Sequence, residues 1–243
     1  MERNHGARTI RARIDGLDWR EAEGSLARLG YARSRHVLLD AAECRALSAL
    51  YADDRLFRSR IEMARHRFGE GEYKYFARPL PPIVAALRDG LYRRLAKIAN
   101  AWMAQLGEAR RYPPGLDAFL AECAVRGQTR PTPLLLRYRE GGFNCLHQDL
   151  YGEVAFPLQA MIPLSRSGAD YTGGEFLLVE QRPRAQSVAT AIAPARGELV
   201  VFPNRIRPVE GSRGWYRAGV RHGASRILTG SRDAVAIIFH DAA

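Results

Sequence analysis

The chain has 243 residues, of which 47% are hydrophobic and 26% charged, and its formal net charge is +11. A chain of this length and composition buries a sizeable core, which excludes an intrinsically disordered protein, and its charge is compatible with an anionic partner such as nucleic acid. No apolar run approaches the about 20 residues needed to cross a bilayer, and the N-terminus lacks the apolar stretch of a secretory signal.

The first half of the chain is predicted to be mainly helical. Three signals typical of helix boundaries support this prediction. Gly30 ends one apolar pattern, Asp40 precedes the next, and Pro81 and Pro82 open the longest one. The alternating stretch 31–39 is predicted to be a strand. The expected helices are 19–30, 39–54, 81–107 and 116–127.

The pattern changes near residue 131. Short apolar or alternating runs are separated by Gly, Pro, Asn or Ser every ten residues or so, which is typical of an antiparallel sandwich or barrel. We therefore expect an α+β protein, in which a helical region (1–130) packs on a β-barrel (131–243) within one structural domain. The expected strands are 133–140, 155–165, 174–180, 186–194, 197–203, 216–223 and 233–241.

The stretch "GGFNCLHQDLYGE" (141–153) contains a candidate metal site. His147 and Asp149 stand two residues apart in a predicted turn, and His222 lies near the end of a later predicted strand. Alone, this pair is compatible with an ordinary loop. Two histidines and one carboxylate, however, form the facial triad of non-haem Fe(II) oxygenases, which leaves three coordination positions open.

A candidate anion-binding residue follows ten positions after His222. Strand alternation places Arg232 on one face with Ala234, Ala236 and Ile238, so its guanidinium points the same way as a core-facing side chain. A buried arginine requires an anion. An arginine at the start of a solvent-exposed strand is the alternative interpretation.

This pattern resembles the Fe(II)/2-oxoglutarate dioxygenases, whose core is a double-stranded β-helix, or jelly roll. The resemblance covers about residues 131–241. More narrowly, "LRYREGGFNCLHQDLYGE", "FPLQ", "TGGEF", "EQRPRAQS" and "RHGASR…GSR…IIFHDA" resemble a bacterial subgroup described as acting oxidatively on damaged DNA. The resemblance implies Fe(II), the co-substrate 2-oxoglutarate and O₂.

Carried onto this chain, the resemblance implies that His147, Asp149 and His222 bind Fe(II) and that Arg232 binds the distal carboxylate of 2-oxoglutarate. Arg226 is the competing candidate for that carboxylate. His5, His36 and His66 are not expected to be ligands, whereas His240 stays open because it ends the strand that carries Arg232.

Three further residues were assigned from their positions alone. Tyr138 is expected either to donate its hydroxyl to the co-substrate or to be a core aromatic residue. Gln159 lies in a predicted strand and either lines the site or faces outward, of which the outward position is the favoured interpretation. Cys145 is expected to be a small structural residue, since thiolates suit softer metals. The chain has three cysteines at wide spacing, which predicts a reducing, cytoplasmic environment without disulfides.

Two basic and aromatic segments, 55–76 and 205–216, are candidates for the surroundings of a substrate. Arginines track phosphates and aromatic rings stack on unpaired bases, so both segments favour alkylated DNA or RNA as a partner. The alternative is that they are helix faces and loops whose aromatic residues pack inward. The residues concerned are Arg55, Arg58, Arg60, Arg65, Arg67, Phe68, Tyr73, Tyr75, Phe76, Arg205, Arg207, Arg213, Trp215 and Tyr216.

Three hypotheses follow for the function. The first is an oxygenase that demethylates alkylated nucleic acid. The second is an oxygenase that hydroxylates a protein side chain or a small molecule on the same barrel. The third is a jelly-roll binding protein without turnover, which the triad and the arginine disfavour because simple binding needs neither.

Overall fold

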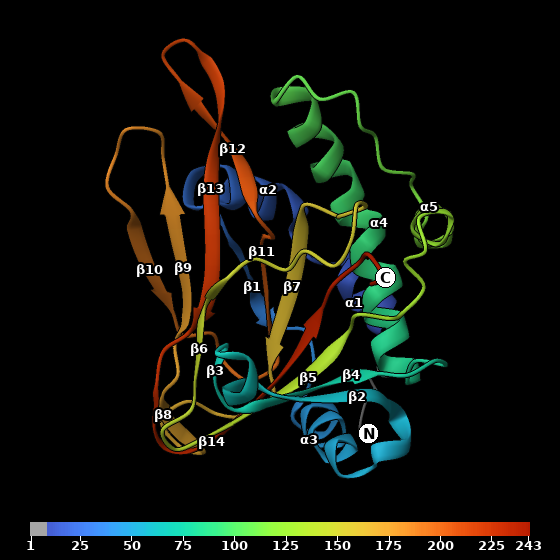
Figure 1. Cartoon of the computed structure of the whole chain (residues 1–243), viewed down its shortest axis with the longest axis vertical. Helices are drawn as coiled ribbons and strands as arrows, with labels where there is room; N and C mark the ends of the chain where they lie inside the picture. Colours follow the sequence, from blue (N-terminus) through green and yellow to red (C-terminus); the bar gives the residue numbers. More distant parts are fainter. Residues whose placement is uncertain (1–8) are drawn as a thin grey trace, which may run out of the picture.

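The computed structural model describes residues 9–243, and two antiparallel sheets form its centre (Figure 1). The main sheet has the order β1-β11-β7-β14-β5-β4-β2, with β8 paired to β14, and the second sheet has the order β10-β9-β13-β6-β3, with β12 paired to β13. The strands are β1 (Ala32–Val37), β2 (Phe57–Glu62), β3 (Gly69–Glu70), β4 (Glu72–Phe76), β5 (Leu134–Arg139), β6 (Phe143–His147), β7 (Leu158–Pro163), β8 (Tyr171–Gly173), β9 (Phe176–Gln181), β10 (Val188–Ile192), β11 (Glu198–Pro203), β12 (Ile206–Gly211), β13 (Gly214–Ala224) and β14 (Ile227–Ile237).

The two sheets face each other across a shared apolar core. Met161 and Phe202 of the main sheet pack in one buried cluster with Phe176 and Val220 of the second sheet. This arrangement is that of a jelly roll, which confirms the predicted core.

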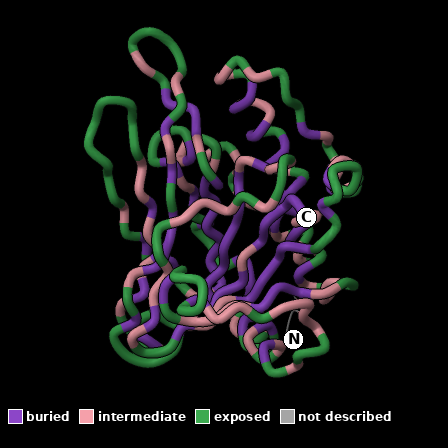
Figure 2. Tube along the Cα trace, viewed as in Figure 1, coloured by how far each residue is buried: buried purple, intermediate pink, exposed green. Residues whose placement is uncertain are grey.

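Helices cover the other face of the main sheet. The α-helices are α1 (Ile10–Asp15), α2 (Trp19–Leu29), α3 (Ala41–Ala49), α4 (Pro82–Gln105) and α5 (Leu116–Val125). Leu91 and Leu95 of α4 share a buried cluster with Leu135, Ile162 and Val235 of the sheet. Figure 1 shows α4 along one side of this sheet, and Figure 2 shows the buried strands between the two covering layers. Because both faces are covered, every residue of β7 is buried.

The helix boundaries follow the predicted signals. Gly30 closes α2 in the left-handed conformation, with φ 79°. Asp40 caps α3 and forms a capping box with Glu43. Pro82 is the first residue of α4. No helix within residues 9–243 combines the length and apolar character needed to span a membrane.

The structure differs from the predicted elements in two places. For the stretch 55–76 the alternative interpretation was helix faces and loops, but it forms β2, β3 and β4, and Lys74 and Tyr75 of β4 pair in register with Leu135 and Leu134. Residues 205–216 belong to the β12–β13 hairpin. Helices still predominate before residue 130, while β1, β2 and β4 extend the main sheet.

Candidate metal centre

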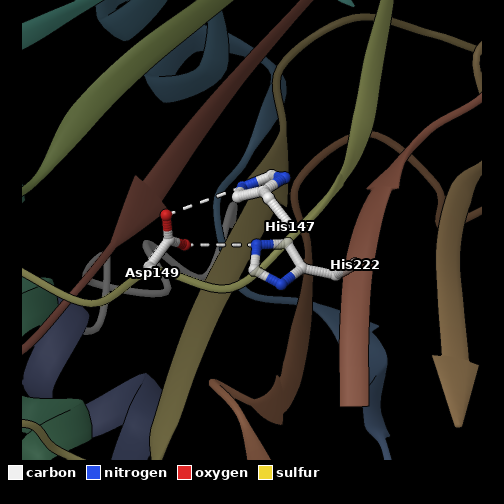
Figure 3. A group of neighbouring side chains, drawn as sticks. All are labelled: His147, Asp149 and His222. Atoms are coloured by element: carbon white, nitrogen blue, oxygen red, sulfur yellow. Dashed lines mark ion pairs between the residues drawn. The ribbon is translucent and has the colours of Figure 1, made fainter. Parts of the chain in front are cut away.

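The three predicted ligands come together at one end of the second sheet (Figure 3). His147 ends β6 and lies opposite His222 of β13 in the antiparallel register, so their rings are 4.3 Å apart. Asp149 follows two residues later and turns its carboxylate toward both rings. Its Oδ2 is 3.2 Å from Nε2 of His222, and its Oδ1 is 3.5 Å from Nε2 of His147.

The electrostatics of the three residues suit a divalent cation. Burial alone would raise the pKa of Asp149, but the hydrogen bond from His222 and the neighbouring imidazoles hold it well below its usual range. Burial lowers the pKa of His222, so this ring is neutral at pH 7. An ionised carboxylate and a neutral imidazole are the protonation states that a metal requires.

A backbone contact at Nδ1 fixes the orientation of the His147 ring. Its Nδ1 lies 2.8 Å from the carbonyl oxygen of Cys145, which leaves Nε2 facing Asp149. Two imidazole nitrogens and one carboxylate, with their ligand atoms within 4.8 Å of one another, match the donor set of a non-haem Fe(II) centre. The residues present therefore fit this metal.

A second layer of contacts, which sequence reasoning missed, supports Asp149. Tyr151 donates its hydroxyl to Oδ1 at 2.7 Å, and Tyr75 donates to the hydroxyl of Tyr151 at 3.0 Å. The backbone N–H of Asp149 donates to the side chain of Asn204 at 3.0 Å. Burial, followed by the nearby carboxylate, raises the pKa of Tyr151 well above its ordinary value, so the phenol stays protonated and remains a donor.

We expect Tyr151→Phe to weaken Fe(II) binding about 10- to 100-fold, since partners that orient a ligand have effects of this size. Anaerobic titration with Fe(II), or with Co(II) followed by its visible absorption, measures this directly. Tyr216→Phe is the control, because it removes a phenol of β13 that does not line the cavity. Equal metal affinity in the two variants would contradict the positioning role.

The predicted anion-binding pair lies in the same cavity as the triad. Arg232 of β14 and Tyr138 of β5 are cross-strand neighbours, and both line a cavity of about 410 Å³ together with His147, Asp149 and His222. Arg232 is 3% exposed, and its side chain has no hydrogen-bond or ion-pair partner among residues 9–243. A buried guanidinium that forms no hydrogen bond or ion pair is costly, even with the charge of Glu175 in its neighbourhood, so this end of the cavity suits an anion.

Tyr138 is placed to assist this anion. Its ring is 1% exposed and lies 5.7 Å from the guanidinium of Arg232, while its hydroxyl accepts a hydrogen bond from Asn144 at 3.2 Å. Burial raises the pKa of Tyr138 to about 12, so the phenol keeps its proton for donation. Tyr138 is therefore a core aromatic residue that also lines the cavity, and its donation to the co-substrate stays a prediction.

The competing arginine faces away from the cavity. Arg226 is exposed, donates to the carbonyl oxygen of Gly141 at 2.6 Å and lies over the ring of Phe143 at 4.5 Å. It is not among the residues that line the cavity. Of these two arginines, only Arg232 lines the cavity.

Two smaller expectations were wrong. Gln159 does not face outward: it is 2% exposed, lines the cavity and has its Nε2 3.5 Å from Nε2 of His222. Both faces of β7 are buried, so alternation gives no outward position. Cys145 is not packed as a small core residue, because its side chain is exposed at the mouth of the cavity.

The other histidines lie apart from the candidate centre. His36 is exposed on β1, and His66 stacks on Phe68. His240 is buried, and its Nδ1 accepts a hydrogen bond from the backbone of Phe156. His5 lies outside the described residues. Within the described part of the chain, the triad is the one group of three such side chains that could hold a metal ion.

The second basic and aromatic segment does not surround the site. Arg207 is 1% exposed and paired with Glu180 at 2.5 Å, so it cannot track phosphates. Trp215 stands seven residues before His222 on an extended strand, a separation of about 23 Å. It cannot stack on a base that is held at the metal.

Comparison with known proteins identifies an oxygenase family whose sequence model matches this chain. Residues 71–242 match the sequence model of a family described as "Oxygenase, catalysing oxidative methylation of damaged DNA". Uncharacterised proteins of two Mycobacterium tuberculosis strains, CDC 1551 / Oshkosh and ATCC 25618 / H37Rv, are 53% identical over 168 residues, which cover 69% of this chain and 72% of each relative.

Solved structures share the fold at low sequence identity. An oxidoreductase of the 2OG-Fe(II) oxygenase family from Burkholderia pseudomallei aligns with a TM-score of 0.56 and 17% identity, over 92% of this chain and 90% of its own. A Pseudomonas putida prolyl-4-hydroxylase aligns with a TM-score of 0.52 and 17% identity, over 93% and 99%.

Proposed function

The chain belongs to the oxygenase family described as acting oxidatively on damaged DNA, and from this membership we propose an Fe(II)- and 2-oxoglutarate-dependent dioxygenase that demethylates alkylated bases of DNA. The observation that carries the proposal is the presence, in one cavity, of a two-histidine, one-carboxylate cluster and a buried arginine that forms no hydrogen bond or ion pair. A binding protein requires neither, which disfavours the hypothesis of a jelly roll without turnover.

The roles of the residues follow from their charges. His147, Asp149 and His222 hold Fe(II), while Arg232, with the hydroxyl of Tyr138, binds the distal carboxylate of 2-oxoglutarate. Before the co-substrate enters, the metal and Arg232 leave the cavity strongly positive despite Asp149. The two carboxylates of 2-oxoglutarate neutralise this charge, so the enclosed site favours a dicarboxylate over a monocarboxylate.

Fe(II) held by these three residues would activate O₂, which is the oxidant: 2-oxoglutarate would lose CO₂ and become succinate with one oxygen atom of O₂, and the other would be inserted into a substrate C–H bond. If that carbon is an N-methyl group, the N-hydroxymethyl product breaks its C–N bond and releases formaldehyde, while the proton of the hydroxyl moves to the base nitrogen. The protein contributes orientation, because the walls formed by Tyr73, Tyr75 and Leu134 limit which carbon reaches the metal.

The substrate is tested by the stimulation of succinate release. We expect an oligonucleotide with an N-methylated base to raise 2-oxoglutarate turnover several-fold over the same sequence without the methyl group. The formaldehyde released should equal the additional succinate. The unmethylated oligonucleotide is the matched control, since it binds through the same phosphates and offers no methyl group to the metal. Stimulation by a peptide and not by methylated DNA would instead establish the hypothesis of protein hydroxylation.

A further inference from the structure

The mouth of the cavity is bordered by residues 63–70, here called the mouth segment. It consists of the 3-10 helix η3 (Met63–His66) followed by β3, which pairs with β6. The N–H of Cys145 donates to the carbonyl oxygen of Phe68 at 2.8 Å, two residues before the candidate ligand His147. Figure 1 shows this turn beside β6, and Figure 2 shows that it is exposed. The mouth segment therefore lies where a substrate must pass.

Arg67 differs from Arg55, Arg60 and Arg65 in its ion pairing. Arg55 pairs with Asp53 at 2.8 Å, Arg65 pairs with Glu62 at 2.6 Å, and Arg60 pairs with Glu72. These cations are already neutralised by the protein itself. Arg67 is exposed, lines the cavity and has no acidic partner among residues 9–243, so it is available to an anion that enters the mouth.

The backbone of the mouth segment is held in an unusual conformation at this arginine. Arg67 has φ 59° and ψ 31°, in the left-handed region that a residue with a side chain seldom adopts. This reversal ends η3 and brings the rings of His66 and Phe68 together, stacked with centroids 5.3 Å apart and planes inclined by 23°. Strained backbone of this kind clusters at binding sites.

The apolar side chains at the mouth are exposed. Phe68 is 47% exposed, and Leu146 and Leu150, which flank the candidate ligands in sequence, are 41% and 47% exposed. All three line the cavity. A flat, apolar ligand group would cover them, and Arg67 adds a cation beside them, so the mouth is complementary to an aromatic group linked to an anion.

We propose that Arg67 and Phe68 recognise single-stranded DNA, with Phe68 stacking on the unpaired base and Arg67 binding its phosphate. The inference rests on the proposed function and specifies the form of its substrate. An unpaired base exposes the π-face that an aromatic side chain needs, whereas a base within a duplex is already stacked on its neighbours. A cavity of about 410 Å³ is at the small end of ligand sites, which suits one base and the co-substrate.

The experiment is a binding measurement by fluorescence anisotropy on the protein loaded with Fe(II) and 2-oxoglutarate without O₂. The probe is a labelled single strand of roughly 10 nucleotides with one N-methylated base. We expect Phe68→Ala to weaken binding by roughly 5- to 150-fold with an unchanged salt dependence, as for the loss of one stacking contact. We expect Arg67→Gln to reduce the slope of log affinity against log salt by about 0.7, the value for one phosphate on a single strand.

Two matched controls separate these effects from the loss of any arginine charge or of any exposed aromatic surface. Arg65→Gln removes an arginine of the same segment that is already paired with Glu62, and Trp215→Ala removes an exposed aromatic residue that does not line the cavity. Both should bind the probe as the unmodified protein does.

The outcomes also separate the inference from the proposed function. If methylated single strands are bound and demethylated, but Phe68→Ala and Arg67→Gln behave as their controls, the inference fails while the proposed function stands. Equal affinity for the duplex form of the probe overturns the inference as well. If the unmodified protein neither binds nor demethylates DNA and a peptide stimulates turnover, both fail together.

Discussion

Replacing His222 by alanine should abolish 2-oxoglutarate turnover and lower the affinity for Fe(II) by at least about 100-fold. Loss of a group that merely orients a ligand already costs about 10- to 100-fold, so loss of a ligand should cost more. His222 is also the most enclosed of the three ligands, with a side chain 7% exposed, so water replaces it poorly. Anaerobic Fe(II) titration and succinate release measure the two effects separately.

The matched control is His36→Ala, which removes an exposed histidine remote from the triad. It should retain metal binding and turnover. Thermal unfolding of both variants without metal distinguishes a lost ligand from a lost fold. Metal binding that survives in a folded His222→Ala protein would show that the ligands are misassigned.

Replacing Arg232 by methionine should raise the concentration of 2-oxoglutarate needed for half-maximal turnover by roughly 10- to 150-fold. A hydrogen bond to a charged group contributes about 1.5–3 kcal/mol, and each 1.4 kcal/mol is a factor of ten. Methionine matches the aliphatic part of the arginine side chain and carries no charge, so the variant removes the guanidinium while keeping apolar contacts along its stem. Fe(II) affinity without co-substrate should stay nearly unchanged, because Arg232 does not contact the triad in any hydrogen bond or ion pair.

Arg226→Met is the control for this variant. Arg226 is exposed, and its guanidinium donates to the backbone of Gly141, outside the cavity. Its removal should leave the requirement for 2-oxoglutarate as it was. If the two variants exchanged these phenotypes, the anchor would be Arg226 and the cavity would need another explanation for its buried guanidinium.

Local patterns predicted most of the elements, because their causes lie within a few residues of each other. The αL glycine at position 30 and the capping box at Asp40 specify helix ends without reference to the rest of the chain. The strands that carry Tyr138, His222 and Arg232 were predicted from their short apolar or alternating runs, whereas β6, which carries His147, was not. The candidate ligands were found because two histidines and one carboxylate, followed ten residues later by an arginine, match the pattern of the Fe(II)/2-oxoglutarate dioxygenases.

What remained hidden depends on contacts between distant residues. Nothing near Arg207 in sequence shows that Glu180 neutralises it, and nothing near Tyr151 shows that Tyr75 completes its hydrogen bonds. Gln159 was misplaced because alternation assumes one solvated face, whereas β7 is covered on both. Strands β6 and β12 were missed because their sequences are polar, rich in arginine or typical of turns. Both form by pairing with β13, which lies far from β6 in the sequence.

The two outer strands of the main sheet, β1 and β2, bear on aggregation of the protein. β1 covers the outer edge of β11 and β2 covers that of β4, and both precede residue 71, where the match to the oxygenase family begins. A protein reduced to the matched region would present two open rows of backbone N–H and C=O groups to its neighbours. Such rows recruit strands from other molecules and lead to aggregation. Residues 9–70 thus cover the edges of β11 and β4 in the main sheet, and their mouth segment borders the cavity.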